Sequence, residues 1–154
     1  MAVLKLAALD TDDLQVISAH VQDALVTGTD MRFLPRENRF MLAMKRFAWE
    51  ETARKGRDAK KPDERRVSLL KFDRVMGVKA RGIRQNDGTA IYDLLSVSFE
   101  PSDDPAGTIT LTFAGDFEIA LDVECIEVQL TDTAAAWAAS KRPDHDLSDK
   151  GSGR

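Results

Sequence analysis

The sequence has 154 residues, and its acidic side chains outnumber the basic ones by 26 to 22, which gives a formal net charge of −4. Hydrophobic residues make up 43% and charged residues 31% of the chain, which excludes wholesale disorder and fits a globular domain with its own core. The single cysteine, Cys125, excludes an internal disulfide and a multi-thiolate zinc site. We expect one globular domain over residues 1–142 and a disordered polar tail over residues 143–154.

The sequence shows no targeting or membrane-spanning segment. No apolar run approaches the roughly 20 residues that a transmembrane helix needs. The first residues, MAVLKLAALDTDD, lack the charged region and the long apolar region of a secretion signal. We therefore expect a cytoplasmic protein.

The first elements in chain order are a strand and a helix. Residues 3–9 predict a short strand, and residues 11–26 place apolar side chains at helical spacing. Asp10 is the expected N-cap, and Gly28 is the expected stop just past the end of the helix.

Strands follow over residues 30–34 and 39–49, with a turn at residues 35–38 between them. Within 39–49 the apolar side chains change from one parity to the other near Lys45–Arg46. Because residues of one parity share one face of a strand, this change predicts a bulge or a strong bend there.

Residues 67–83 predict two strands with a turn or bend near Asp73–Gly77. A half-buried strand comes next, in which Leu95, Val97 and Phe99 alternate with serines and define the inward face.

The last part of the chain predicts a hairpin and then a helix. Residues 107–123 alternate strictly, and Gly115–Asp116 supplies a two-residue hairpin connection. Residues 126–142 have apolar side chains at helical spacing and many alanines, which predicts a C-terminal helix. The alternation over 126–130 also permits a strand.

These elements indicate the α+β class, with an antiparallel β-barrel or strongly bent sheet. About seven strands, split four and three, come after an N-terminal strand and helix and before a C-terminal helix. That order of elements matches a pleckstrin-homology-like barrel, since a run of antiparallel strands must close or stack to cover its apolar face.

Several stretches together resemble a known family. They are LKLAALDTDDLQVISAHVQDA, FLPRENRF, FDRVMGVKARGI, LLSVSFEP, GTITLTFAG and DVECIEVQL. They resemble an uncharacterised, mainly alphaproteobacterial family that is known only as a domain of unknown function, over roughly residues 4–147. The resemblance implies a bacterial, cytosolic, single-domain protein, and it supplies no catalytic residue and no ligand.

No catalytic set emerges from the residues. Glu124 and Glu127 flank Cys125 and would raise the pKa of a thiol, so we expect a core cysteine. His20 lies beside the apolar stripe of the first helix, and His145 lies in the polar tail. Neither has enough partners for a metal site. Phosphate-binding loops and nucleophile elbows are absent from the sequence, so we expect no cofactor and no metal.

The charge pattern singles out residues 50–66, which predict an exposed loop that is either a mere solvated connector or a binding segment. Its cations make the segment 54–66 a candidate site for anions inside an acidic protein. They are Arg54, Lys55, Arg57, Lys60, Lys61, Arg65 and Arg66.

Three functions compete at this point. The first is a non-catalytic binding or adaptor module that recognises a protein partner through a sheet edge or a barrel groove. The second is a module that binds a polyanion, nucleic acid or anionic lipid, through residues 54–66. The third is an enzyme of unrecognised type, for which His20 is the first residue to inspect in a polar pocket.

Overall fold

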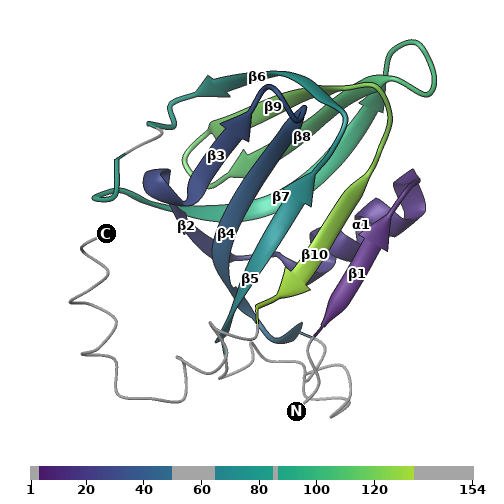
Figure 1. Ribbon diagram of the computed structural model, residues 1–154. Coiled ribbons are helices and arrows are strands. Elements are labelled where there is room, and N and C mark those ends of the chain that lie inside the picture. The colour runs from purple at the N-terminus through teal and green to yellow at the C-terminus, as the bar shows by residue number, and fades with distance from the viewer. Residues whose placement is uncertain (1–3, 50–64, 85–86, 134–154) are drawn as a thin grey trace.

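The computed structural model describes residues 4–49, 65–84 and 87–133 (Figure 1). In chain order its elements are β1 (Lys5–Ala8), α1 (Thr11–His20), β2 (Ala24–Thr27), the short 3-10 helix η1 (Gly28–Asp30), β3 (Met31–Leu34), β4 (Arg39–Phe47), β5 (Arg65–Phe72), β6 (Val75–Arg81), β7 (Ile91–Pro101), β8 (Gly107–Phe113), β9 (Phe117–Val123) and β10 (Val128–Asp132). Across these described ranges, no helix is long and apolar enough to cross a bilayer.

All the described strands belong to one antiparallel sheet. Its order is β1-β10-β5-β4-β2-β7-β8-β9-β6, and β3 pairs with β4 beside this path. The path ends at β1 on one side and at β6 on the other, so the sheet does not close into a continuous barrel.

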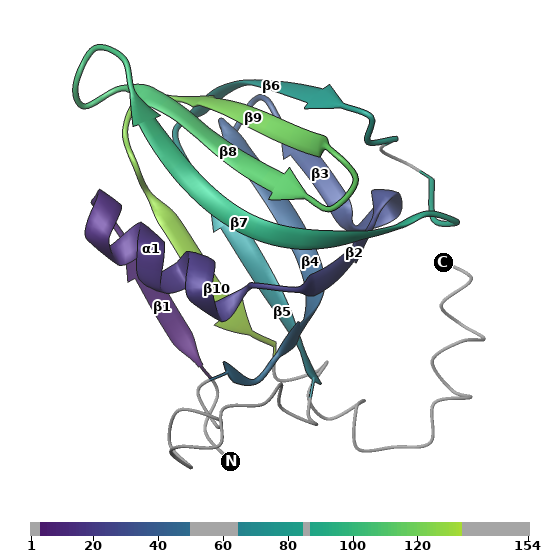
Figure 2. The same cartoon turned by 180° about the vertical axis from the view of Figure 1, so that it is seen from behind.

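The sheet curls into two layers. Strands β3, β4, β5, β10 and β1 form the front layer of Figure 1, and β7, β8, β9 and β6 lie behind them. Helix α1 packs against both β1 and β7, and so covers the opening between the two layers on that side (Figure 2). Ser18 anchors the helix to β7, since its Oγ accepts a hydrogen bond from the Val97 backbone N–H at 2.9 Å.

The core lies between the layers. Leu14 and Ile17 of α1 are buried against inward side chains from nearly every strand. Phe40 and Phe72 contribute a tilted ring pair from the front layer, with centroids 6.2 Å apart. Inward side chains of a strand alternate with outward ones, which is the period expected for a sheet with one face on the core.

The helix is shorter than predicted. Asp10 is the N-cap, as expected, and its carboxylate accepts from the Asp13 N–H at 2.8 Å. The helix ends at His20 rather than near residue 26, because residues 24–27 pair with β7 and β4 as strand β2. Gly28 therefore opens η1 and does not stop α1.

The bulge predicted near Lys45–Arg46 is wrong. The pairing of β4 with β5 runs without interruption from Phe40 to Phe47. The inward position after Met44 is taken by Arg46, which is fully buried. The sequence pattern changed parity because a charged side chain points into the core, and the pairing with β5 stays in register.

A bulge occurs instead on β7. The pairing of β7 with β8 shifts between Leu94 and Ser96, which turns Leu95 outward with 41% of its surface exposed. Val97 and Phe99 point inward as predicted, whereas Leu95 does not. The extra residue of a bulge changes the parity of the strand, which explains the difference.

The predicted hairpin is confirmed, with β8 and β9 paired from Gly107↔Val123 to Phe113↔Phe117. Three residues connect the two strands rather than two. Gly115 and Asp116 within this connection have positive φ angles of 92° and 65°, which glycine and aspartate tolerate best.

The C-terminal helix predicted from residue 126 is wrong where the structure describes the chain. Residues 128–132 form β10, which lies between β1 and β5, so the alternative strand is the correct one. Its two strand partners supply the backbone hydrogen bonds that outweigh local helix propensity. The α+β class and the bent sheet are confirmed, but the described residues form ten strands in an open sheet, where about seven strands after an N-terminal one were predicted. The remainder of the predicted helix and the predicted tail, residues 134–154, lie outside the described residues.

Candidate functional site

The five strands of the front layer contribute basic side chains to its outward side and no acidic one, although Asp73 follows directly after β5. Along β1, β3, β4, β5 and β10 the only acidic residue is Asp132, and it points inward. We call the outward side chains of these five strands the cationic face. Its charged members are Lys5, Arg32, Arg39, Lys45, Arg65 and Lys71.

The register of the strands arranges these cations as a border. Four apolar side chains form the centre of the cationic face, in the paired positions Ala43↔Leu69, Lys45↔Val67 and Met41↔Lys71. The remaining cations lie around this centre, with Arg32 opposite Met41 on β3 and Lys5 opposite Thr131, which in turn lies opposite Leu69. The cationic face therefore has an apolar centre and a border of cations, although the net charge of the protein is negative.

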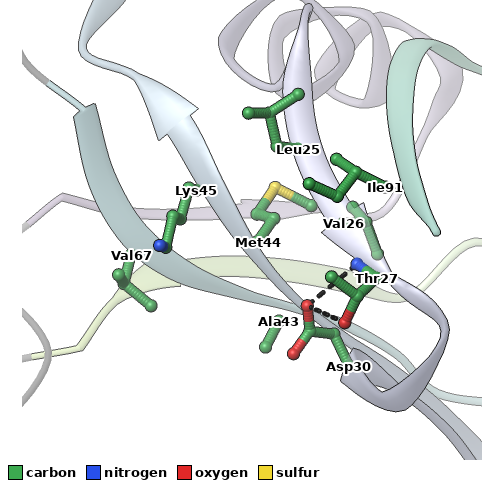
Figure 3. A pocket seen from close by; sticks show the side chains of 9 residues that line it. All are labelled: Leu25, Val26, Thr27, Asp30, Ala43, Met44, Lys45, Val67 and Ile91. Carbon is green, nitrogen blue, oxygen red and sulfur yellow. Dashed lines mark hydrogen bonds between the residues drawn. The ribbon is translucent and has the colours of Figure 1, made fainter. Parts of the chain in front are cut away.

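A pocket of about 180 Å³ opens on this face where β2 and β4 separate (Figure 3). The two strands pair only at Leu25↔Lys45. After β2 the chain turns away from β4 through η1, and it pairs with β4 again as β3. Most of the lining is apolar. It consists of Leu25, Val26, Thr27, Asp30, Ala43, Met44, Lys45, Val67 and Ile91.

Two charged side chains stand among these lining residues. Asp30 is held in place as part of a capping box, since its Oδ2 accepts from both the N–H and the hydroxyl of Thr27 at 2.9 Å (Figure 3). Lys45 is exposed and belongs to the cationic border. Ile91 contributes an aliphatic side chain with 66% of its surface exposed, so the pocket has an apolar wall open to solvent.

The cations of the border differ in how they are held. Arg39 donates from Nε to Asp73 at 2.8 Å, and this hydrogen bond raises the pKa of its guanidinium. Lys71 lies 3.9 Å from the same carboxylate group. Lys5, Arg32 and Lys45 form no ion pair with another residue in the ranges 4–49, 65–84 and 87–133.

The sequence placed Arg65 in a loop, but it begins strand β5. Its guanidinium lies over the Phe47 ring at 3.8 Å from the ring centroid and donates to the Lys45 carbonyl oxygen at 3.0 Å. The Phe47 ring also meets Trp49 edge-on, with centroids 5.5 Å apart. Arg65 therefore fastens the ends of β4 and β5 together as well as contributing charge to the face.

Arg66 was predicted to lie in an exposed loop, but it is buried. It is 5% exposed and points into the core, with Nη1 at 3.6 Å from the Asp132 carboxylate. Arg46 donates to the same carboxylate from Nη2 at 2.9 and 3.1 Å, and Ser68 donates to it from its hydroxyl. A buried carboxylate between two arginines joins β4, β5 and β10, so Arg66 is unsuited to bind an external anion.

The other five cations of the predicted segment lie outside the described residues. They are Arg54, Lys55, Arg57, Lys60 and Lys61. The segment that contains them joins β4 to β5, whose last paired residues are Phe47 and Arg65.

Two of the residues weighed for catalysis, His20 and Cys125, lie within the described part of the chain. The Nδ1 atom of His20 lies 2.9 Å from the Val16 carbonyl oxygen of the same helix. His20 does not line the pocket between β2 and β4. Cys125 is half-buried rather than part of the core. Within the described part of the chain no three metal-binding side chains cluster. His145 lies outside that part.

The sequence held a signal for the cationic face that our prediction missed. Arg39, Lys45, Arg65 and Lys71 all have odd numbers and share the parity of the outward side chains in β4 and β5. Parity within each strand would have placed them on one face. Their juxtaposition with Lys5 and Arg32 depends on long-range pairing, which no local pattern reveals.

Comparison with known proteins adds a family but no chemistry. Neither the curated proteins nor the solved structures searched contain a match to this chain. A family model does match, over residues 4–145, and thus spans every described strand and the whole cationic face. The chain belongs to the family described as protein of unknown function (DUF2948), as the resemblance in its sequence predicted.

Proposed function

We propose that this protein is a non-catalytic binding or adaptor module whose partner is a protein, and that the partner binds on the cationic face. The observation that supports the proposal is the composition of this face. Six outward cations, of which Arg39 and Lys71 lie beside Asp73, surround an apolar centre and a pocket, in a chain of net charge −4. Protein interfaces characteristically combine an apolar centre with a polar rim.

The size of the pocket favours a side chain over a metabolite. Pockets for drug-sized ligands and cofactors run to about 300–1,000 Å³, whereas a cavity of about 150 Å³ accepts benzene. The pocket here, at about 180 Å³, suits one aliphatic or aromatic side chain. We also propose a cytoplasmic location, on the sequence grounds given above.

Site-specific photo-crosslinking tests the proposal. A photoreactive phenylalanine analogue replaces Leu69 at the centre of the cationic face or, as the control, the exposed Ser98 on the outward side of β7. We expect a discrete protein adduct from position 69 in growing cells, its loss when Lys45→Glu is added, and no such adduct from position 98. Equal adducts from both positions, or none from position 69, would contradict the proposal.

A second candidate is polyanion binding through residues 54–66. The observation that favours it is that the segment with Arg54, Lys55, Arg57, Lys60 and Lys61 joins two strands of the cationic face. Replacing these five cations with glutamine should then abolish binding to a fluorescent single-stranded DNA oligomer and remove the steep salt dependence of that binding. Binding that survives the replacement excludes this candidate.

A further inference from the structure

The pocket and its border together define the chemistry of the partner. We infer that the cationic face binds an acidic polypeptide segment that inserts one aliphatic side chain into the pocket between β2 and β4. The inference rests on the proposed function and deepens it, since it names what the partner must present.

Charge complementarity supplies the acidic part. Lys5, Arg32 and Lys45 are exposed and form no ion pair with other described residues, so carboxylates of a partner can reach them. They border three sides of the apolar centre, at β1, at β3 and beside the pocket. Five strands spaced about 4.8 Å apart make a face roughly 20 Å wide, which a segment of about six extended residues spans.

The lining of the pocket supplies the aliphatic part. Leu25, Val67 and Ile91 surround it, and Met44 and Val26 form its buried floor. An aliphatic side chain that enters loses contact with water and gains these neighbours, whereas a carboxylate would be desolvated there beside Asp30. The acidic Asp30 also discourages a second anion inside the pocket, so the partner's charges belong on the border.

The same features disfavour a nucleic acid. Single strands bind non-specifically by stacking their bases on exposed aromatic rings. The Phe47 ring at the end of the face is already covered by the Arg65 guanidinium, and the pocket lining contains no aromatic residue. A base is also more polar than the apolar side chain that this pocket accommodates.

Methyl NMR of the full chain tests the inference with defined probes. One probe is a ten-residue peptide of alternating Asp and Glu with a central Leu, and the other has Gly in place of that Leu. We expect the Leu peptide to shift the methyl signals of Leu25, Val67 and Ile91 and to leave those of Val16, which is 48% exposed on α1, unchanged. Burial of one Leu side chain should make its dissociation constant at least about tenfold lower than that of the Gly peptide.

Matched variants separate the two parts of the inference. Ala43→Ile fills the pocket from β4 and should abolish the preference for Leu, whereas Ala120→Ile on the outward side of β9 should keep it. Lys45→Glu should weaken both peptides at least tenfold, whereas Lys79→Glu, an exposed lysine on β6, should change neither.

Three results would overturn the inference. They are equal affinity for the two peptides, no shift of the pocket methyl signals at millimolar peptide, and stronger binding on the same methyl groups by a single-stranded DNA of equal charge. If the crosslink from position 69 still forms in any of these cases, the proposed protein-binding function stands and only the chemistry of the partner is wrong.

Discussion

At the scale of single residues, the buried charges of the core stand out. Arg46 and Asp132 are 0% and 3% exposed, and Arg46 donates to the Asp132 carboxylate from both Nε and Nη2. Asp132 Oδ2 also accepts from the Leu4 backbone N–H at 3.3 Å, so one carboxylate joins β10 to three other parts of the chain, namely β4, β5 and the residue before β1. Buried ion pairs often add little net stability, but removal of one partner leaves a buried charge without compensation.

Asp132→Ala should therefore lower the free energy of unfolding by about 3–5 kcal/mol. Asp122→Ala, on the exposed side of β9, is the matched control and should change it by less than about 0.5 kcal/mol. Urea unfolding followed by circular dichroism measures both. Equal effects of the two substitutions would show that the buried carboxylate contributes nothing particular.

A second residue-scale prediction concerns Asp87. Its carboxylate accepts from the Thr89 hydroxyl at 2.6 Å and from the Thr89 N–H at 2.9 Å, and these bonds lower the pKa of Asp87. A lowered pKa in the folded state means that Asp87 stabilises the fold above its ordinary pKa. This stability is lost as the pH falls through the lowered value.

Thr89→Val removes the hydroxyl, which is the larger cause of the shift, and keeps the backbone N–H. We expect the pKa of Asp87 to rise toward its ordinary value. Titration of its side-chain carboxyl signal by NMR in the two proteins measures the change. An unchanged pKa at Asp87 would mean that the hydroxyl bond does not form in solution.

At the scale of elements, η1 fits closely against a neighbouring segment. A Cβ on Gly28 would meet the Arg84 carbonyl oxygen and lie 2.6 Å from that of Asp87. Both atoms belong to the backbone, so neither can rotate away as a side chain would. The same short helix carries Asp30, which lines the pocket, so this close contact holds the pocket wall that follows β2.

Gly28→Ala should consequently destabilise the protein by about 1–3 kcal/mol, the range typical of overpacking. Gly77→Ala on β6 is the matched control, because a Cβ there meets nothing within 4 Å. Thermal unfolding of the two variants measures the difference. If Gly28→Ala unfolds at the same temperature as Gly77→Ala, the close approach is not rigid.

The same scale shows what the sequence could and could not predict. Strands with strict alternation, such as β8 and β9, were predicted almost to the residue because local pattern and long-range pairing agree there. The end of α1 and the identity of β10 were not, because partners distant in sequence decide both. Arg46 was misread because burial of a charge depends on Asp132, which lies far along the chain.

For the candidate site, the sequence pointed to cations near residue 54–66 but not to the face that the strands create. Arg65 and Arg66 are neighbours in sequence and have opposite surroundings, since successive strand residues point to opposite sides. The pocket could not be predicted at all, since it arises where β2 and β4 separate.

At the scale of the whole molecule, the two layers differ in their charge: the other layer mixes basic residues such as Lys79 and Arg81 with acidic ones. The cationic face contrasts with the other strands and turns, which carry exposed acids such as Asp103, Asp104, Asp116 and Asp122. Salt screens charges that lie farther away than a Debye length of about 8–10 Å. A partner or resin close to the cationic face is therefore attracted by the cations of that face more than it is repelled by the net charge of the protein.

We therefore expect the protein to be retained on a cation-exchange resin at pH 7, although its sequence pI is about 5.2. Lys45→Glu should lower the salt concentration at which it elutes, and Lys79→Glu on the other layer should lower it less. Elution profiles of the three proteins at one pH measure this. Passage of the unaltered protein through the resin at low salt would contradict a functional cationic face.

The pairing of β1 with β10 has a consequence for synthesis. Lys5 lies opposite Thr131, so the first strand acquires its only sheet partner when nearly the last described residue has been made. At about 5–20 residues per second, the nascent β1 waits on the order of ten seconds for that partner. Helix α1, which packs on β1 and β7, must wait with it. We conclude that this protein completes its fold only after the sequence of its described strands has left the ribosome.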